Sequence, residues 1–99
     1  MKIKITKSAY NDIVVAQNFY KTQKPGLGEY FQNSILADID SLNIYAGIHK
    51  VQQGHYRLLS KKFPYAIYYK IVDNAIIVTA ILDCRRNPLW IKKKLKKWK

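Results

Sequence analysis

Hydrophobic residues in the first part of the chain recur with two different spacings, one typical of strands and one of helices. In the segment 2–6, lysines alternate with Ile3 and Ile5, which is the two-residue period of a strand with one buried face. Beyond it, apolar residues lie three or four positions apart and so share one helical face. We therefore expect a first helix from an N-cap at Ser8 to about Thr22. Its buried face should consist of Ala9, Ile13, Ala16 and Tyr20.

A second apolar stripe follows a break in the helical pattern. The sequence QKPGLG, residues 23–28, combines a proline with two glycines, which is typical of a turn. Apolar residues then return at helical spacing and stop near Gly47, a residue type that favours helix ends. This stripe consists of Leu27, Phe31, Ile35, Ile39 and Leu42. Two helices joined by so short a turn are expected to form an antiparallel hairpin.

The pattern changes after Gly54 to short runs rich in tyrosine, isoleucine and valine. The runs HYRLLSK, YAIYYKIV and AIIVTAILD are separated by residues 62–64 and by Asp73–Asn74, which predicts a three-stranded antiparallel meander. The last run is apolar on both faces, as a central strand is, so the segment 2–6 is expected to pair beside it in one sheet. The fold class is therefore predicted to be α+β.

A short basic helix is predicted at the C-terminal end of the chain. Asn87 is a good N-cap, and Pro88 would take the first helical position, where its missing N–H costs nothing. The segment 87–99 combines lysines with apolar residues at helical spacing, namely Ile91, Leu95 and Trp98. Such lysines either anchor a protein to phosphate groups or form a solvated face. Trp90 and Trp98 place aromatic rings among the charges, which favours a binding surface.

Length and charge narrow the possible partners. The chain has 99 residues, enough for one domain with one core. It carries 18 Lys and Arg against 6 Asp and Glu, a net charge of +12, which predicts a nucleic acid, an acidic protein surface or anionic lipid as partner. No apolar run reaches the roughly 20 residues that span a bilayer. The single cysteine and the lack of a signal-peptide pattern favour a cytoplasmic location.

Candidate catalytic and metal-binding residues are sparse. His49, His55, Cys84 and the scattered acids have no recognised ligand spacing, so we predict neither a metal site nor a cofactor. Cys84, next to Arg85, could be a reactive thiolate, but the pattern favours a small buried residue at a strand end. His55 could transfer protons, but a surface histidine at the start of a strand is the favoured alternative.

The most distinctive charged feature is the pair Arg85–Arg86, which joins the last strand to the predicted helix. Two guanidinium groups match the geometry of phosphate or carboxylate, and the free N–H groups of a helix start add to the same positive field. Arg57, in the first strand of the meander, is expected to contribute a third guanidinium. Ordinary surface charge is the alternative, but the pattern favours an anion-binding site.

The order of strand, helical hairpin, meander and basic C-terminal segment, together with YRLLSKKFPYAIYYKI and AILDCRRNP, resembles the RelE/ParE superfamily of bacterial type II toxins. The resemblance covers essentially the whole chain, residues 1–99, as one toxin domain. It implies a small toxin neutralised by a cognate antitoxin, which in this family wraps a helix and an extended segment across the toxin. We expect no small-molecule substrate and no membrane partner.

Two branches of this superfamily act differently. RelE-like members cleave messenger RNA on the ribosome with basic residues of the meander and an arginine at the end of the last strand, whereas ParE-like members bind DNA gyrase. Arg57 and Arg86 match two of the RelE-like positions, but Leu59 and Ala66 stand where two further basic residues would be expected. Phosphate cleavage needs positive charge at the scissile group. The resemblance therefore favours ParE-like gyrase inhibition, with a ribosome-dependent mRNA endoribonuclease as the alternative.

Two functional surfaces are predicted. The residues expected to bind an anion or the target are Arg57, Lys61, Lys62, Arg85, Arg86 and Trp90. In the ribonuclease alternative, Arg57 and Arg86 would be catalytic. Tyr65, Tyr68 and Tyr69 are expected to offer an exposed aromatic row to the antitoxin, with core or cross-strand packing as the alternative. A plain nucleic-acid-binding module is the third functional hypothesis.

Overall fold

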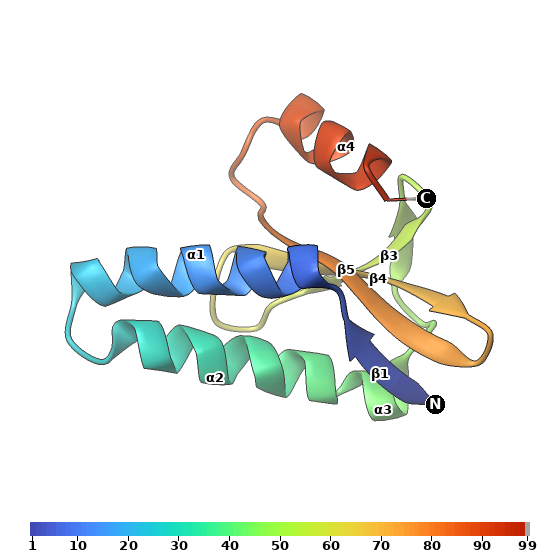
Figure 1. Ribbon diagram of the computed structural model, residues 1–99, viewed down its shortest axis with the longest axis horizontal. Helices are drawn as coiled ribbons and strands as arrows, with labels where there is room; N and C mark the ends of the chain where they lie inside the picture. Colours follow the sequence, from blue (N-terminus) through green and yellow to red (C-terminus); the bar gives the residue numbers. More distant parts are fainter. Residues whose placement is uncertain (99) are drawn as a thin grey trace.

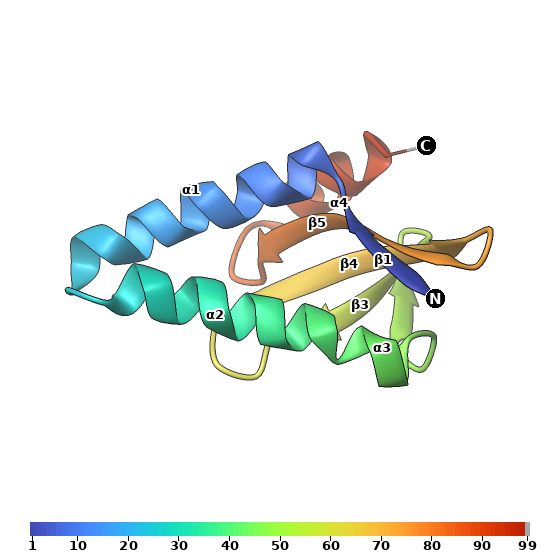
Figure 2. The same ribbon diagram turned by 60° about the horizontal axis from the view of Figure 1, so that its bottom comes forward.

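The computed structural model describes residues 1–98, and Lys99 lies outside the described part. A five-stranded sheet carries a helical hairpin on one face and a short helix on the other (Figures 1 and 2). The predicted α+β class is confirmed. The elements in chain order are β1 (Lys2–Ile5), α1 (Lys7–Gln23), α2 (Leu27–Asp40), α3 (Leu42–Tyr45), β2 (Lys50–Gln52), β3 (His55–Leu59), β4 (Tyr65–Val72), β5 (Ala75–Asp83) and α4 (Pro88–Lys96).

The strand order is β1-β5-β4-β3-β2, with β1 parallel to β5 and the other neighbours antiparallel. The predicted meander and the pairing of the first strand with the last one are both confirmed. Because β5 lies between β1 and β4 and is covered on both faces, its continuous apolar run is explained. The short edge strand β2, which pairs with β3 through a turn at Gln53–Gly54, was not predicted.

The predicted first helix forms, but its N-cap is Thr6 and not Ser8. Thr6 has an extended backbone, and its hydroxyl accepts a hydrogen bond from the Ala9 N–H at 3.1 Å, which satisfies one of the free donors of the helix start. Ser8 is already inside α1. The predicted apolar face is confirmed, because its four residues are all buried: Ala9, Ile13, Ala16 and Tyr20.

The second stripe is buried except for Leu27, which is partly buried, and it spans two helices. α2 ends at Asp40, and the single turn α3 follows after Ser41, whose hydroxyl donates to the Asp38 carbonyl at 2.6 Å. At the other end of α2, Gly28 lets the hairpin close, since a Cβ there would lie 2.8 Å from the Gln17 carbonyl oxygen of α1.

The sheet face covered by α1 and α2, here called the hairpin face, carries the larger core. Its centre is an aromatic cluster in which Phe31 packs on Tyr20, Phe63 and Tyr65, with ring centroids 4.9 to 5.1 Å apart. Isoleucines from α1, α2, β4 and β5 surround these rings. Burial of this much apolar surface is the main contribution to stability.

The opposite sheet face, here called the α4 face, carries a smaller core. The Asn87 side chain caps α4 by accepting from the Leu89 N–H at 2.8 Å, and Pro88 takes the first turn, as predicted. The buried residues beneath and on α4 are Ala66, Tyr68, Ala80, Leu82, Ile91 and Leu95. Within the described residues, no helix is both long and apolar enough to cross a membrane.

Candidate functional site

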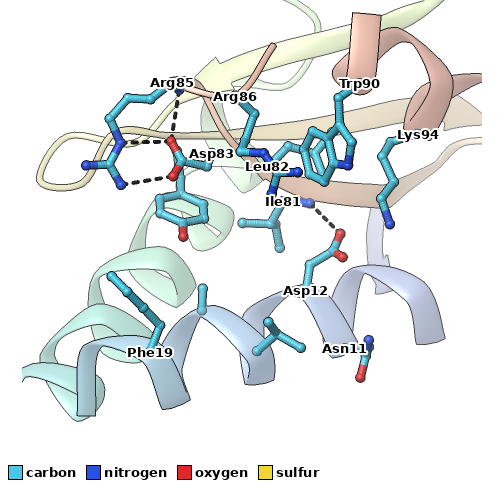
Figure 3. Close-up of a pocket in the computed structure, with 13 residues that line it drawn as sticks. Asn11, Asp12, Phe19, Ile81, Leu82, Asp83, Arg85, Arg86, Trp90 and Lys94 are labelled. Atoms are coloured by element: carbon cyan, nitrogen blue, oxygen red, sulfur yellow. Dashed lines mark hydrogen bonds and ion pairs between the residues drawn. The ribbon is translucent and has the colours of Figure 1, made fainter. Parts of the chain in front are cut away.

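The arginine pair lies where β5 leaves the sheet and the chain turns into α4 (Figure 3). The Arg85 guanidinium donates to both carboxylate oxygens of Asp83, at 3.0 and 2.9 Å, and the Arg85 N–H donates to the same group at 2.9 Å. These hydrogen bonds lower the pKa of Asp83. Arg85 is therefore partly neutralised, and a carboxylate or phosphate ligand would have to compete with Asp83 for it.

Arg86 points away from this ion pair and stacks on Trp90. Its guanidinium carbon lies 3.9 Å from the centre of the Trp90 ring, and the Lys94 ammonium lies 5.4 Å from it. Cation–π contacts of this kind hold a charged group in place without neutralising it. Arg86 is thus a fixed, available cation, and Trp90 is the residue that positions it.

An open groove of about 360 Å³ runs between α1 and the start of α4, and we call it the α1–α4 groove (Figure 3). One wall is basic, with Arg85, Arg86 and Lys94, and the other is apolar, with Val15 and Phe19 of α1. These two apolar side chains are 61% and 52% exposed, so they offer apolar surface that a partner could cover. The groove therefore combines positive charge with uncovered apolar surface.

Asp12 forms the floor of this groove. Its carboxylate accepts from the Ile81 N–H at 3.0 Å and thereby satisfies a backbone donor of β5 beyond the end of β1. Burial raises the pKa of Asp12, although the Ile81 hydrogen bond and nearby Lys94 act in the opposite direction. Sequence reasoning missed Asp12. The available signal was an acid next to Ile13 on the predicted buried side of a helix in a chain with few acids.

Arg57 lies on the α4 face, next to the turn that carries Arg85 and Arg86 between β5 and α4, here called the arginine turn. It faces Tyr68 across the β3–β4 ladder, and its Nη2 lies 3.6 Å from the Cys84 sulfur, one residue before Arg85. Within the described residues, the buried Nε of Arg57 has no hydrogen-bond partner. Arg57 therefore borders the site, as expected, but much of its guanidinium is directed into the protein. Cys84 is partly buried at the strand end, as favoured.

Lys61 and Lys62 do not join this cluster. They lie in the β3–β4 loop beside α2, where the Lys61 N–H donates to the buried Asp38 carboxylate at 3.4 Å. The Lys62 ammonium lies 5.2 Å from the centre of the Tyr30 ring. Both lysines thus belong to the hairpin side of the molecule, and Arg85, Arg86 and Trp90 form a separate group.

The predicted exposed aromatic row is wrong. Tyr65, Tyr68 and Tyr69 are only 9%, 1% and 0% exposed, so the core-packing alternative holds. Alternation along β4 sends Tyr65 and Tyr69 into the hairpin core and Tyr68 beneath α4. Burial, with a smaller contribution from Tyr20, raises the pKa of Tyr65 to about 12, so its phenol is uncharged at neutral pH.

His55 is also buried, contrary to the favoured surface position. Its Nε2 contacts the Leu95 carbonyl of α4 at 3.3 Å, and its Nδ1 contacts the Thr79 hydroxyl of β5 at 2.9 Å. Burial is the main reason that the pKa of His55 is lowered. This histidine ties the end of α4 to the sheet and does not line the groove.

The two departures from the RelE-like pattern are neighbours in the structure. Leu59 of β3 pairs directly with Ala66 of β4. Ala66 is fully buried beneath α4, whereas Leu59 is 54% exposed. An apolar pair therefore occupies the place on the α4 face where two basic side chains were expected.

Comparison with known proteins identifies the fold. No model of a protein family matches the sequence, and no curated protein matches it. A solved structure described as the chromosomal ParDE toxin–antitoxin system from P. aeruginosa contains a chain that matches with a TM-score of 0.71 and 20% identity, over 82% of this chain and 92% of that one. The chain has the fold of that ParDE chain. The resemblance predicted from the sequence is thus confirmed at the level of the fold.

Proposed function

We propose that this chain is the toxin of a type II toxin–antitoxin system, that it is ParE-like, and that it inhibits growth through DNA gyrase. The shared fold with a chain of a ParDE system supports the toxin assignment. The choice of gyrase over messenger RNA is carried by one observation, the apolar pair of Leu59 and Ala66 on the α4 face.

Cleavage of RNA by attack of a ribose 2′-hydroxyl requires a preorganised positive environment around the phosphate. Removing one donor from such a site costs about 3 to 4 kcal/mol of transition-state stabilisation. Here the two expected cations are missing, and Ala66 lies beside its cross-strand partner Leu82, beneath the apolar side of α4. Of the three basic positions expected on β3 and β4, only that of Arg57 holds a cation, and its guanidinium is directed toward Cys84. This arrangement argues against a ribonuclease.

The proposed antitoxin site is the α1–α4 groove. Arg86 and Lys94 would attract carboxylates, while Val15 and Phe19 would be covered by apolar side chains of the same segment. Charge complementarity speeds association, and buried apolar anchors supply most of the affinity. The expected ligand is therefore an acidic, amphipathic segment of the cognate antitoxin. Of the β4 tyrosines, Tyr65 lines this groove, although it is only 9% exposed, whereas Tyr68 and Tyr69 are buried and do not line it.

The target is tested by two assays with the same purified chain. It should inhibit the supercoiling activity of gyrase and leave the message of programmed ribosomes uncut. Codon-positioned cuts that disappear in an Arg86→Ala variant would establish the ribonuclease alternative. A Lys21→Ala variant, which removes one exposed cation at the far end of α1, is the matched control and should behave as the unmodified chain in both assays.

The antitoxin is tested by co-expression with the protein encoded in the adjacent reading frame. The two proteins should purify together, and Phe19→Asp should weaken the complex at least tenfold, about 1.4 kcal/mol, because it places a charge where an apolar side chain must bind. Leu36→Asp, on the exposed side of α2, is the matched control. Equal weakening by both variants, or separation of the unmodified pair at moderate salt, would refute this site.

A further inference from the structure

The outward side of α4 is a second basic surface, which shares Arg86 and Trp90 with the α1–α4 groove. Ile91 and Leu95 pack on the sheet, so the opposite side of the helix presents Lys92, Lys93 and Lys96 to solvent. Together with Arg86, these lysines line a wide, shallow depression of about 660 Å³. Lys92 and Lys96 are one helical turn apart and form a row along the helix axis. The three lysines take no part in the α1–α4 groove.

The charge of this surface is not compensated within the protein. The sequence contains no Asp or Glu after Asp83. Within residues 1–98 there is one ion pair, formed by Arg85 and Asp83. The lysines of α4 also lie in the last turns of the helix, where its dipole favours positive charge. The helix therefore places these lysines close together, and no ion pair neutralises them within residues 1–98.

We propose that the outward side of α4 binds the phosphate backbone of duplex DNA without reading its sequence. Each lysine that meets a phosphate releases condensed counterions, and this release favours binding. Duplex DNA carries one charge per about 1.7 Å of axis, twice the density of a single strand. A row of several lysines along one helix gains most from the ligand with the densest charge.

Two features favour duplex DNA over other partners, namely single-stranded nucleic acids, proteins and lipid surfaces. Single-stranded nucleic acids bind strongly when their bases stack on free aromatic rings, but the Trp90 ring is already engaged by Arg86 and lies near Lys94. Within α4, which the structure describes in full, Leu89 is the one large apolar side chain that is strongly exposed. A single exposed leucine does not supply the aromatic anchors of a protein interface. It also offers too little apolar surface for insertion into a lipid surface.

This inference does not depend on gyrase or on the antitoxin. Binding of labelled duplex DNA by the full chain is measured by fluorescence anisotropy over a range of salt concentrations. A Lys92/Lys93/Lys96→Gln variant should bind at least about tenfold more weakly at low salt, and its slope of log affinity against log salt should fall by about 2.7, or 0.9 for each lost phosphate contact. Unrelated duplex sequences should bind equally well.

The matched control is Lys2/Lys21/Lys24→Gln, which makes the same change in net charge at exposed positions on β1 and at the tip of the hairpin. It should keep the affinity within about threefold and the slope unchanged. Thermal melts verify that the variants are folded. If the triple variant is unstable, the single charge reversal Lys93→Glu replaces it in the DNA-binding measurement. Equal losses in both triple variants, or tighter binding of the single strand than of the duplex, would overturn the proposal. If the unmodified chain binds DNA but does not inhibit gyrase, the proposed function alone is refuted.

Discussion

The hairpin face of the sheet is covered by two helices of 17 and 14 residues, whereas the α4 face is covered by one helix of 9 residues. The hairpin core is built from interlocking aromatic rings and isoleucines. The α4 core contains two alanines, and a buried histidine contacts the end of the helix. Exposed basic side chains lie around this core. Both faces belong to the same strands, so the difference arises from the side chains on each face and from the helices that cover them.

This difference is the basis for our proposal that the hairpin face mainly stabilises the fold and that the α4 face carries the function. The hairpin face buries large side chains in its core, as a face does that mainly stabilises the fold. The α4 face has a thin core and carries the residues with available charge, Arg86 among them. Functional elements are drawn from the less stable parts of a protein. If the two faces differ in this way, substitutions on the hairpin face should mainly lower stability, and substitutions of charged residues on the α4 face should mainly lower activity.

The largest effect is expected from Phe31→Ala at the centre of the hairpin core. Phe31 is fully buried and contacts three other aromatic rings, so its truncation should cost about 3 to 5 kcal/mol of unfolding free energy. Chemical denaturation followed by circular dichroism measures this loss. A cost below about 1 kcal/mol would show that the aromatic cluster is not the main stabilising element.

A smaller and more local effect is expected from Leu95→Ala in α4, at the low end of the 2 to 5 kcal/mol range for such truncations. The chain has two tryptophans, Trp90 and Trp98, and both lie in or beside α4. Tryptophan fluorescence therefore reports on α4, and circular dichroism reports on the whole fold. In Leu95→Ala the fluorescence transition should precede the dichroism transition. Coincident transitions would mean that the two faces unfold as one unit.

Acid should loosen the α4 face through His55. Burial lowers the pKa of His55 in the folded state below its ordinary value of 6.5, so the unfolded chain takes up the proton first as the pH falls. The stabilising contribution is complete above pH 6.5 and decreases as the pH falls from 6.5 toward the folded-state pKa. Denaturation midpoints followed by tryptophan fluorescence between pH 7.5 and 5.5 should therefore decrease.

His49 supplies the control for this prediction. Burial also lowers its pKa, but it contacts the Tyr69 hydroxyl near β2 and not α4. His55→Gln should remove most of the pH dependence of the fluorescence midpoint, and His49→Gln should leave it in place. The opposite result would place the pH-sensitive contact on the hairpin side.

The elements that the sequence predicted correctly are those with long, regular patterns. The helical stripe from Ala9 to Tyr20 and the apolar run of β5 repeat often enough to define a period, and Asn87–Pro88 is a local signal that needs no tertiary information. β2 is only three residues long and contains one apolar residue, Val51, which is itself exposed. Its strand conformation depends on pairing with β3.

Errors at the site arose from contacts between distant residues. The tyrosines of β4 are buried because α4 and the hairpin cover both faces of that strand, which no local pattern reveals. His55 is buried by the end of a helix 40 residues later in the chain. Asp12 joins the site through a backbone group 69 residues away. The arginine turn was recognisable because its residues are adjacent in the sequence.

The smallest changes in stability are expected at two cations that sit over aromatic rings on opposite sides of the molecule. Arg86 lies over Trp90 at 3.9 Å, and Lys62 lies over Tyr30 at 5.2 Å. Exposed cation–π contacts contribute about 0.5 to 1 kcal/mol. Arg86→Gln and Lys62→Gln should therefore each lower the unfolding free energy by no more than about 1 kcal/mol, as measured by denaturant titration.

These two variants also provide the most direct test that function belongs to the α4 side. Each removes one positive charge from an aromatic ring and leaves the fold intact, so they differ mainly in the side of the molecule that is changed. The measurement is the concentration of each variant that halves the supercoiling activity of gyrase. We predict that Arg86→Gln raises this concentration at least tenfold and that Lys62→Gln leaves it within about twofold of the unmodified chain. A loss of inhibition in Lys62→Gln with full inhibition by Arg86→Gln would contradict this account and assign the target-binding surface to the hairpin side.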